Sequence, residues 1–235
     1  MPGYLTQEHT VAVAGVANLR IRSLQDRQQY ADPLGEAARL GISSASWPLF
    51  GMLWPSGAQL AAQLALRPVR SGERILEIGC GLALASLVAH RRGAHVTASD
   101  CHPLAAAFLA ENLRLNKLAP LDYRHGQWGA EPGSWTPRGR LGAPAATALA
   151  GQYDLIVGSD LLYEPDPRAT LATFIACHAA PGAEIWVLDP QRGNRPAFHR
   201  QMAAQGFGLT QTDMGRASQG LAAAYRGRLL RYRRG

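Results

Sequence analysis

Cysteine is scarce in this 235-residue sequence: only Cys80, Cys101 and Cys177 are present, and none belongs to a C-x-x-C pair. So sparse and odd a set does not provide a disulfide framework. No group of cysteines and histidines has the spacing of a zinc site, and the adjacent pair Cys101-His102 has poor ligand geometry. We therefore expect three reduced thiols and no structural metal.

The sequence also lacks membrane and export signals. No run approaches the roughly 18 uncharged apolar residues that a membrane helix needs. The first ten residues have no basic stretch followed by an apolar core, as a signal peptide would. We expect a cytoplasmic monomer with no membrane partner, and the length suits one α/β domain with a sizeable core.

Acidic residues are outnumbered, because 17 Asp and Glu face 24 Lys and Arg and the formal net charge is +7. Five arginines crowd the C-terminus, at positions 226, 228, 231, 233 and 234. Basic proteins can favour nucleic acid, but no aromatic residues alternate with these arginines as in a stacking platform. We expect solvated arginines on a last strand, with nucleic acid kept only as an alternative partner.

From about residue 50 onward, strand-like and helix-like apolar patterns alternate. Strands are predicted at 74–78, 95–99, 121–124, 153–158 and 184–188, and helices at 82–92, 103–117, 167–180 and 196–205. Segments 207–213 and 225–233 suggest a closing antiparallel hairpin. This alternation predicts an α/β fold with a mostly parallel sheet and helices on both faces.

Two regions depart from this rhythm. Alternating apolar residues within 10–24 predict an N-terminal β-ribbon, and 130–151 is rich in Gly, Pro and Ala, as in a loop insertion with a short helix at 145–150. No repeat or linker divides the chain. We expect a single domain over 1–235, with an extension at 1–48 and a cofactor-binding core at 49–235.

The strongest local signal is Glu77-Ile78-Gly79-Cys80-Gly81, which lies between a predicted strand and a predicted helix. Glycines permit a tight turn and close approach of a ligand to the backbone, and a helix N-terminus offers unpaired N–H groups. Asp100 ends the next strand, where a carboxylate can bind the hydroxyls of a ribose. The pattern indicates a nucleotide-like ligand at the carboxyl ends of the strands.

The identity of that ligand depends on two neighbours of the glycines. A dinucleotide fingerprint needs a small residue at its sixth position, which is Leu84 here, and no G-K-[ST] of a P-loop is present. The Glu77 carboxylate would repel a pyrophosphate but attract the ammonium group of S-adenosylmethionine (SAM). SAM is favoured, with NAD(P) and a turn without any ligand as the alternatives.

Three further stretches accompany the glycine motif: Leu53-Trp54-Pro55-Ser56-Gly57, Gln127-Trp128-Gly129, and Gly158-Ser159-Asp160-Leu161-Leu162-Tyr163. Together with 75–81, they resemble the class I (seven-β-strand) methyltransferases. More narrowly, they resemble the protein-lysine methyltransferase family that includes the valosin-containing-protein and electron-transfer-flavoprotein-β enzymes. The resemblance covers roughly residues 49–213. It implies a Rossmann-like sheet of order 3-2-1-4-5-7-6 with an antiparallel last strand.

The resemblance also implies the chemistry: SAM as methyl donor, S-adenosylhomocysteine as product, and a lysine of a protein as acceptor. Trp54 would line the cofactor site, Asp100 would hold the ribose and Trp128 would pack on the adenine. The full set implied to bind the cofactor is Trp54, Glu77, Gly79, Cys80, Gly81, Asp100, Cys101, Trp128 and Ser159. The sequence departs from the family where Leu82-Ala83 replace a frequent Thr-Gly and where Gln127 replaces an Asp.

Asp160 and Tyr163 would lie where the acceptor amine enters. Asp160 could orient an ammonium group by a charge-assisted hydrogen bond, and Tyr163 could offer its phenol or ring face. The simpler alternatives are that Asp160 caps the following helix and Tyr163 is a half-buried packing residue. Arg192 follows the fifth strand and either binds an acidic acceptor or faces solvent.

Other functions remain open on the same fold. The chain could methylate a small molecule or RNA, or bind SAM without transferring its methyl group. An oxidoreductase that uses NAD is a further possibility. The Asn/Asp-Pro-Pro-Tyr motif of enzymes that methylate nucleobase amines is absent, since leucines occupy 161 and 162.

Overall fold

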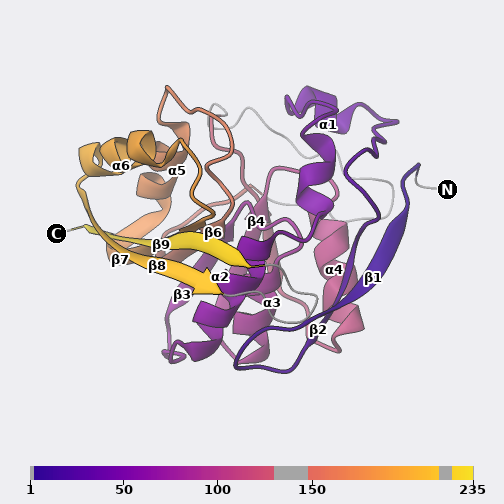
Figure 1. Ribbon diagram of the computed structural model, residues 1–235, viewed down its shortest axis with the longest axis horizontal. Coiled ribbons are helices and arrows are strands. Elements are labelled where there is room, and N and C mark those ends of the chain that lie inside the picture. Colours follow the sequence, from indigo (N-terminus) through magenta and orange to yellow (C-terminus); the bar gives the residue numbers. More distant parts are fainter. Residues whose placement is uncertain (1–2, 130–147, 217–223, 235) are drawn as a thin grey trace.

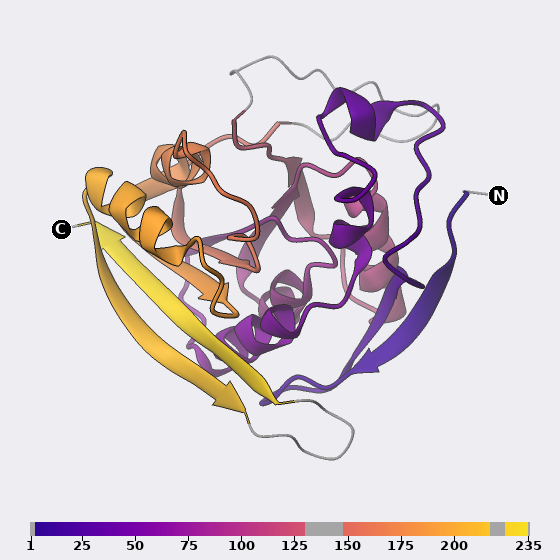
Figure 2. The same cartoon turned by 45° about the horizontal axis from the view of Figure 1, so that its top comes forward.

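The computed structural model describes residues 3–129, 148–216 and 224–234 (Figures 1 and 2). Two strands come first, β1 (Thr6–Val11) and β2 (Leu19–Leu24), followed by the short helices α1 (Glu36–Arg39) and η1 (Trp47–Gly51). The elements that follow alternate along the chain as α2 (Pro55–Leu66), β3 (Arg74–Ile78), α3 (Leu84–Arg91), β4 (His95–Asp100), α4 (Ala105–Leu115), β5 (Asp122–His125), β6 (Tyr153–Ser159), α5 (Thr170–His178), β7 (Ala179–Asp189), α6 (Arg195–Ala204), β8 (Phe207–Arg216) and β9 (Tyr225–Arg234).

The seven-stranded sheet has the order β5-β4-β3-β6-β7-β9-β8. Strand β9 is antiparallel to both of its neighbours, whereas the pairs from β5 to β7 are parallel. Numbered from β3 as the first strand, this is the predicted order 3-2-1-4-5-7-6, so the predicted α/β fold and topology are confirmed.

Helices cover both faces of the sheet because its central strands alternate apolar residues toward each face. Ile75 and Leu155 belong to the apolar cluster that includes helices α2, α3 and α4. Their neighbours Leu76 and Ile156 belong to the cluster of helices α5 and α6. This arrangement leaves the carboxyl ends of β3, β4 and β6 as the edge at which their following loops meet.

The predicted N-terminal ribbon is confirmed, although its first strand begins at Thr6. Two side-chain amides of α4 hold its inner strand. Asn112 Oδ1 accepts from Arg22 N at 2.7 Å, and Asn116 Oδ1 accepts from Arg20 N at 3.0 Å. These amides supply the hydrogen bonds that a third strand would supply, so the ribbon packs against the main fold. Figure 1 shows it on the opposite side of the molecule from the β8–β9 hairpin.

The expectation of solvated arginines holds for part of the C-terminal cluster, because Arg226, Arg233 and Arg234 are exposed and Arg228 and Arg231 are half-buried. The Arg231 guanidinium lies 5.0 Å from the centre of the Trp186 ring, Arg228 pairs with Asp213 at 2.9 Å, and Arg233 pairs with Glu184. The cluster therefore contributes to packing of the last two strands.

Two other expectations concern regions outside the sheet. Most of the predicted loop insertion, and most of its short helix at 145–150, falls on residues 130–147, which lie outside the described residues. Residues 148–150 are described and are not helical. Ala148 forms an isolated β-bridge with His125. Among the described residues, no helix is long and apolar enough to cross a bilayer.

Candidate functional site

A cavity of about 360 Å³ lies at the carboxyl ends of β3, β4 and β6. Every site residue predicted from the sequence lines it: Trp54, Glu77, Gly79, Cys80, Gly81, Asp100, Cys101, Trp128, Ser159, Asp160 and Tyr163. Leu84 and Arg192 line it as well. The carboxyl ends of parallel strands share one edge of a sheet, and this brings together residues that are far apart in the sequence.

The glycine turn can be formed only by glycine at two of its positions. Gly79 and Gly81 have φ of 56° and 51°, in the left-handed region. A Cβ atom at Gly81 would lie 2.8 Å from the carbonyl oxygen of Phe50, and one at Gly79 would lie 2.6 Å from a methyl carbon of Leu161. The turn therefore packs closely against η1 on one side and the loop after β6 on the other.

Asp100 holds the turn in place. Its Oδ2 accepts a hydrogen bond from Gly81 N and its Oδ1 from His102 N, both at 2.8 Å. Burial raises the pKa of Asp100 above its ordinary value, and these backbone N–H groups oppose that rise. The carboxylate thus orders the backbone of the cavity, a role that the sequence did not reveal.

Glu77 is 3% exposed and stabilises the start of α3. Its Oε2 accepts from Ser86 N at 2.7 Å and from the Ser86 hydroxyl. Burial raises the pKa of the Glu77 carboxyl to about 7, while the bonds from Ser86 act in the opposite direction. The expected fixed negative charge is therefore only partly present at neutral pH, and one of its oxygens is already engaged.

The unusual pair Leu82-Ala83 forms the rest of the turn. Leu82 is buried and lines the cavity. Ala83, which is fully buried, precedes α3 with φ 59° and ψ 37°, a left-handed conformation that is unfavourable for a residue with a Cβ atom. The family's frequent glycine would suit this conformation better.

Replacing Ala83 with glycine is expected to stabilise the protein by roughly 1 kcal/mol, because the left-handed penalty disappears. Urea denaturation of the two proteins measures this difference. Ala85→Gly, inside α3, is the matched control and should destabilise by a similar amount or more. Equal destabilisation by Ala83→Gly and Ala85→Gly would refute the strain at position 83.

One wall of the cavity comes from the segment before residue 54, including part of the expected extension. Ile42, Ser46, Leu49, Phe50 and Met52 line it, and none was predicted. Gln127, noted as a departure from the family, donates from Nε2 to Leu40 O at 2.8 Å and so fastens this segment beside the cavity. In the sequence, only the concentration of aromatic residues and prolines within 47–55 indicates that this segment packs against the cavity.

His102 is a second lining residue that the sequence did not identify. Its ring stacks on Phe50 with ring centres 3.6 Å apart, and it lies edge-on to Trp47. Burial lowers the pKa of His102 to about 3, so the ring is neutral. Since Leu104 N donates to its Nδ1 at 3.2 Å, the ring's proton resides on Nε2.

Asp160 follows β6 with φ 59°, a conformation that aspartate tolerates better than most residues. Its Oδ1 pairs with Arg192 Nη2 at 3.1 Å. Burial raises the pKa of Asp160, whereas Arg192 and the Ser56 hydroxyl lower it. The helix-capping alternative is wrong, because the carboxylate that caps α5 belongs to Asp166, which accepts from Leu171 N at 2.9 Å.

Arg192 forms an ion pair with Asp160, a contact that neither of the two expected roles included. Arg192 N donates to Asp189 Oδ2 at 2.8 Å, and Gln191 has φ 64°, so the loop after β7 turns back toward β6. The guanidinium is thereby aimed at Asp160, while the side chain is 30% exposed and lines the cavity. The end of the cavity at Asp160 thus contains an ion pair.

Tyr163 is 45% exposed, which agrees with the half-buried aromatic of the simpler alternative and leaves part of the ring open to a ligand. It lines the cofactor cavity on its outer side, and burial of its phenol raises its pKa to about 12. At neutral pH the phenol is therefore a neutral hydrogen-bond donor and acceptor.

The charges of the cavity suit a cationic nucleoside. Its lining has three carboxylates, Glu77, Asp100 and Asp160, against the single guanidinium of Arg192. Trp54, Phe50 and Trp128 add apolar surface of the kind on which a purine packs. A pyrophosphate would meet net negative charge, whereas a sulfonium with an ammonium group would be complemented. The lining therefore fits SAM.

Known proteins resemble this chain in sequence. No family model matches it. The electron transfer flavoprotein beta subunit lysine methyltransferase of Xenopus laevis is 31% identical over 187 residues, covering 72% of this chain and 69% of that protein. Its Danio rerio counterpart is 27% identical over 70% of this chain, which spans only 64% of that protein, under two thirds of its length. The human histone-arginine methyltransferase METTL23 is 32% identical over 57% of this chain and 67% of its own.

The fold has solved counterparts too. The magnesium protoporphyrin IX methyltransferase of Synechocystis PCC 6803 with bound SAM superposes with a TM-score of 0.54 at 15% identity, covering 77% of this chain and 78% of that one. At this identity, the likeness concerns the fold alone.

Proposed function

This chain belongs to the class I SAM-dependent methyltransferases, in the family that includes the electron transfer flavoprotein beta subunit lysine methyltransferase, and we propose that it methylates a lysine side chain of a protein. The observation that carries the proposal is the Asp160–Arg192 pair, 3.1 Å apart at the acceptor end of a cavity suited to SAM. Residues 1–235 would form one methyltransferase domain.

In this proposal the inner residues bind the cofactor. The glycine turn offers backbone N–H groups and close approach, Asp100 accepts from the ribose, and Trp128 and Trp54 pack on apolar parts of the molecule. Glu77 attracts the ammonium group. Bound SAM would supply a methyl group on a positively charged sulfur.

The outer residues would prepare the acceptor. Asp160 binds the lysine ammonium through a charge-assisted hydrogen bond and orients its nitrogen. A protonated amine has no free electron pair, so a proton must first leave to water. The nearby Arg192 cation makes this easier, because a like charge lowers the pKa of an amine. Tyr163 contacts the side chain at the entrance.

The same ion pair favours lysine over arginine as the acceptor. An arginine guanidinium stays charged at any physiological pH. In this site the guanidinium of an acceptor arginine would meet the carboxylate of Asp160, whose charge Arg192 already neutralises in part. Lysine can lose its proton in this setting and arginine cannot, so the lysine enzymes among the relatives are the better guide than METTL23.

The proposal is tested by incubating the protein with tritiated-methyl SAM and a cell lysate. Separate digestion with protease and ribonuclease identifies the class of acceptor, and acid hydrolysis of labelled protein identifies the methylated amino acid. We expect label that protease releases and that is recovered as methyl-lysine. Lys117 is the chain's single lysine, so Lys117→Arg removes any self-labelling on lysine.

Other outcomes would redirect the assignment. Label lost only to ribonuclease would indicate RNA as the acceptor, and label in methylarginine would reject the argument from Arg192. Label in neither polymer would leave a small-molecule acceptor or a SAM-binding protein without transfer. Tight binding of NAD without binding of S-adenosylhomocysteine, measured by calorimetry, would reject the cofactor itself.

A further inference from the structure

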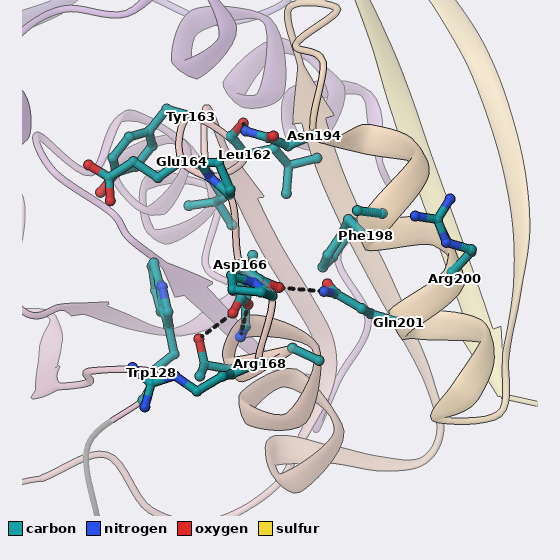
Figure 3. Close-up of a pocket in the computed structure, with 18 of the residues that line it drawn as sticks. Trp128, Leu162, Tyr163, Glu164, Asp166, Arg168, Asn194, Phe198, Arg200 and Gln201 are labelled. Carbon is teal, nitrogen blue, oxygen red and sulfur yellow. Dashed lines mark hydrogen bonds between the residues drawn. The ribbon is translucent and has the colours of Figure 1, made fainter.

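A second and larger cavity, of about 900 Å³, adjoins the cofactor cavity (Figure 3). We call it the acceptor groove. Its walls are residues 127–129, the loop 161–171 and the inner side of 194–205. Trp128, Leu161 and Tyr163 line both cavities, so the two spaces are neighbours that share these side chains.

Hydrogen bonds fix the walls of the groove relative to each other. Asp166 accepts from Thr170 Oγ1 at 3.1 Å and from Leu171 N, and its carbonyl oxygen accepts from Gln201 Nε2 at 2.5 Å. Asn194 Nδ2 donates to Leu162 O at 3.0 Å. Figure 3 shows Asp166 between α5 and α6 with bonds to both. The groove is therefore preformed, which lowers the entropic cost of binding.

The groove lining combines apolar side chains with two carboxylates, Glu164 and Asp166, and two guanidiniums, and the Asp166 carboxylate is already engaged by α5. Leu162 and Phe198 provide buried apolar surface. Glu164, next to Tyr163, is exposed at the end shared with the cofactor cavity. Arg168 and Arg200 are exposed, and neither forms an ion pair with another residue in the described part of the chain.

We propose that the acceptor groove binds the polypeptide on either side of the acceptor lysine, and that Arg168 and Arg200 select acidic residues in that polypeptide. The volume supports this occupant, since the groove is more than twice the size of the cofactor cavity and exceeds what one lysine side chain would fill. Because the exposed Tyr163 borders both cavities, the lysine would turn inward past it to Asp160 while its neighbours stay in the groove.

This inference rests on the proposed function, and its test separates the two. Two fluorescent peptides with one central lysine, one flanked by glutamates and the other by arginines, are titrated with the protein saturated in S-adenosylhomocysteine. Fluorescence anisotropy should show the acidic peptide binding at least about tenfold more tightly, with a preference that shrinks as salt is added.

The variant Arg168→Glu/Arg200→Glu should lose this preference, while its affinity for S-adenosylhomocysteine stays within about twofold of the original. Lys117→Glu, just after α4, makes half of this charge change outside the groove and should bind like the original protein. Equal binding of both peptides, binding of neither, or an unchanged preference in the double variant would overturn the groove assignment.

Labelling of lysate protein distinguishes failure of the groove from failure of the function. If the groove is right, the double variant transfers much less methyl to protein than the original enzyme. If only the groove assignment is wrong, the double variant and the original enzyme transfer equal amounts of methyl to protein. If the proposed function is wrong, the original enzyme itself labels no protein.

Discussion

Replacing Asp160 with asparagine is expected to slow methyl transfer by at least about 100-fold while S-adenosylhomocysteine binds within about twofold of its original affinity. Asparagine keeps the shape of the side chain and tolerates the φ of 59°, so the loop should retain its course. It removes the charge that binds the acceptor ammonium and leaves the Arg192 guanidinium without its partner, 3.1 Å away. The loss should therefore fall on transfer and not on the cofactor.

Tritiated-methyl transfer and calorimetry on the same samples measure the two effects. Asp154→Asn is the matched control, because Asp154 lies on the same strand, β6, and pairs with Arg74 on the surface at 3.2 Å. It should leave both quantities nearly unchanged. Transfer by Asp160→Asn within about tenfold of the original rate would remove Asp160 from the acceptor site.

The affinity for S-adenosylhomocysteine is expected to rise about tenfold between pH 6 and pH 8. Burial raises the pKa of Glu77 to about 7, so its carboxyl is mostly protonated at the lower pH and mostly ionised at the higher one. Only the ionised form attracts the ligand's ammonium group. Affinity therefore grows as the proton leaves, and calorimetry across this range measures the slope.

Glu77→Gln should bind the ligand weakly and with little change over the same range. Folding stability should respond in the opposite direction. Because the folded protein holds the Glu77 proton more tightly than the unfolded chain, the original protein loses stability as pH rises from about 4.5 through 7, and the variant does not. A flat affinity in the original protein, or the same slope in the variant, would show that Glu77 is not the titrating group.

Much of the fold could be predicted because the apolar periodicity of each segment is local. The strand 74–78 and the helix before Gly206 were placed within a residue of the observed elements. Strand β7 begins at Ala179 instead of 184, because its first residues pair with Tyr153 across an irregular register. Helix α3 begins two residues late, because Ala83 takes the left-handed conformation before it.

The cavity-lining residues were predictable for a different reason. Glycine turns and residues at strand ends have fixed positions in a parallel sheet, so a short motif also indicates where its side chains lie relative to the carboxyl edge of the sheet. This placement and the family resemblance, which implied residues such as Trp54 and Trp128, together predicted a set that lines one cavity. Their roles toward cofactor and acceptor stay predictions until the experiments above are done.

The sequence by itself determined the glycine turn and part of the set of side chains around the cavity, and the family resemblance that it carries implied the strand order. Tertiary structure alone decided how those side chains are used. Asp160 and Arg192 are 32 positions apart and meet only because β6 and β7 are neighbours. Gln127 reaches Leu40 across 87 positions, and the acceptor groove forms only where α6 packs beside the loop after β6. Such contacts depend on packing between distant segments, and no local pattern of residue types encodes them.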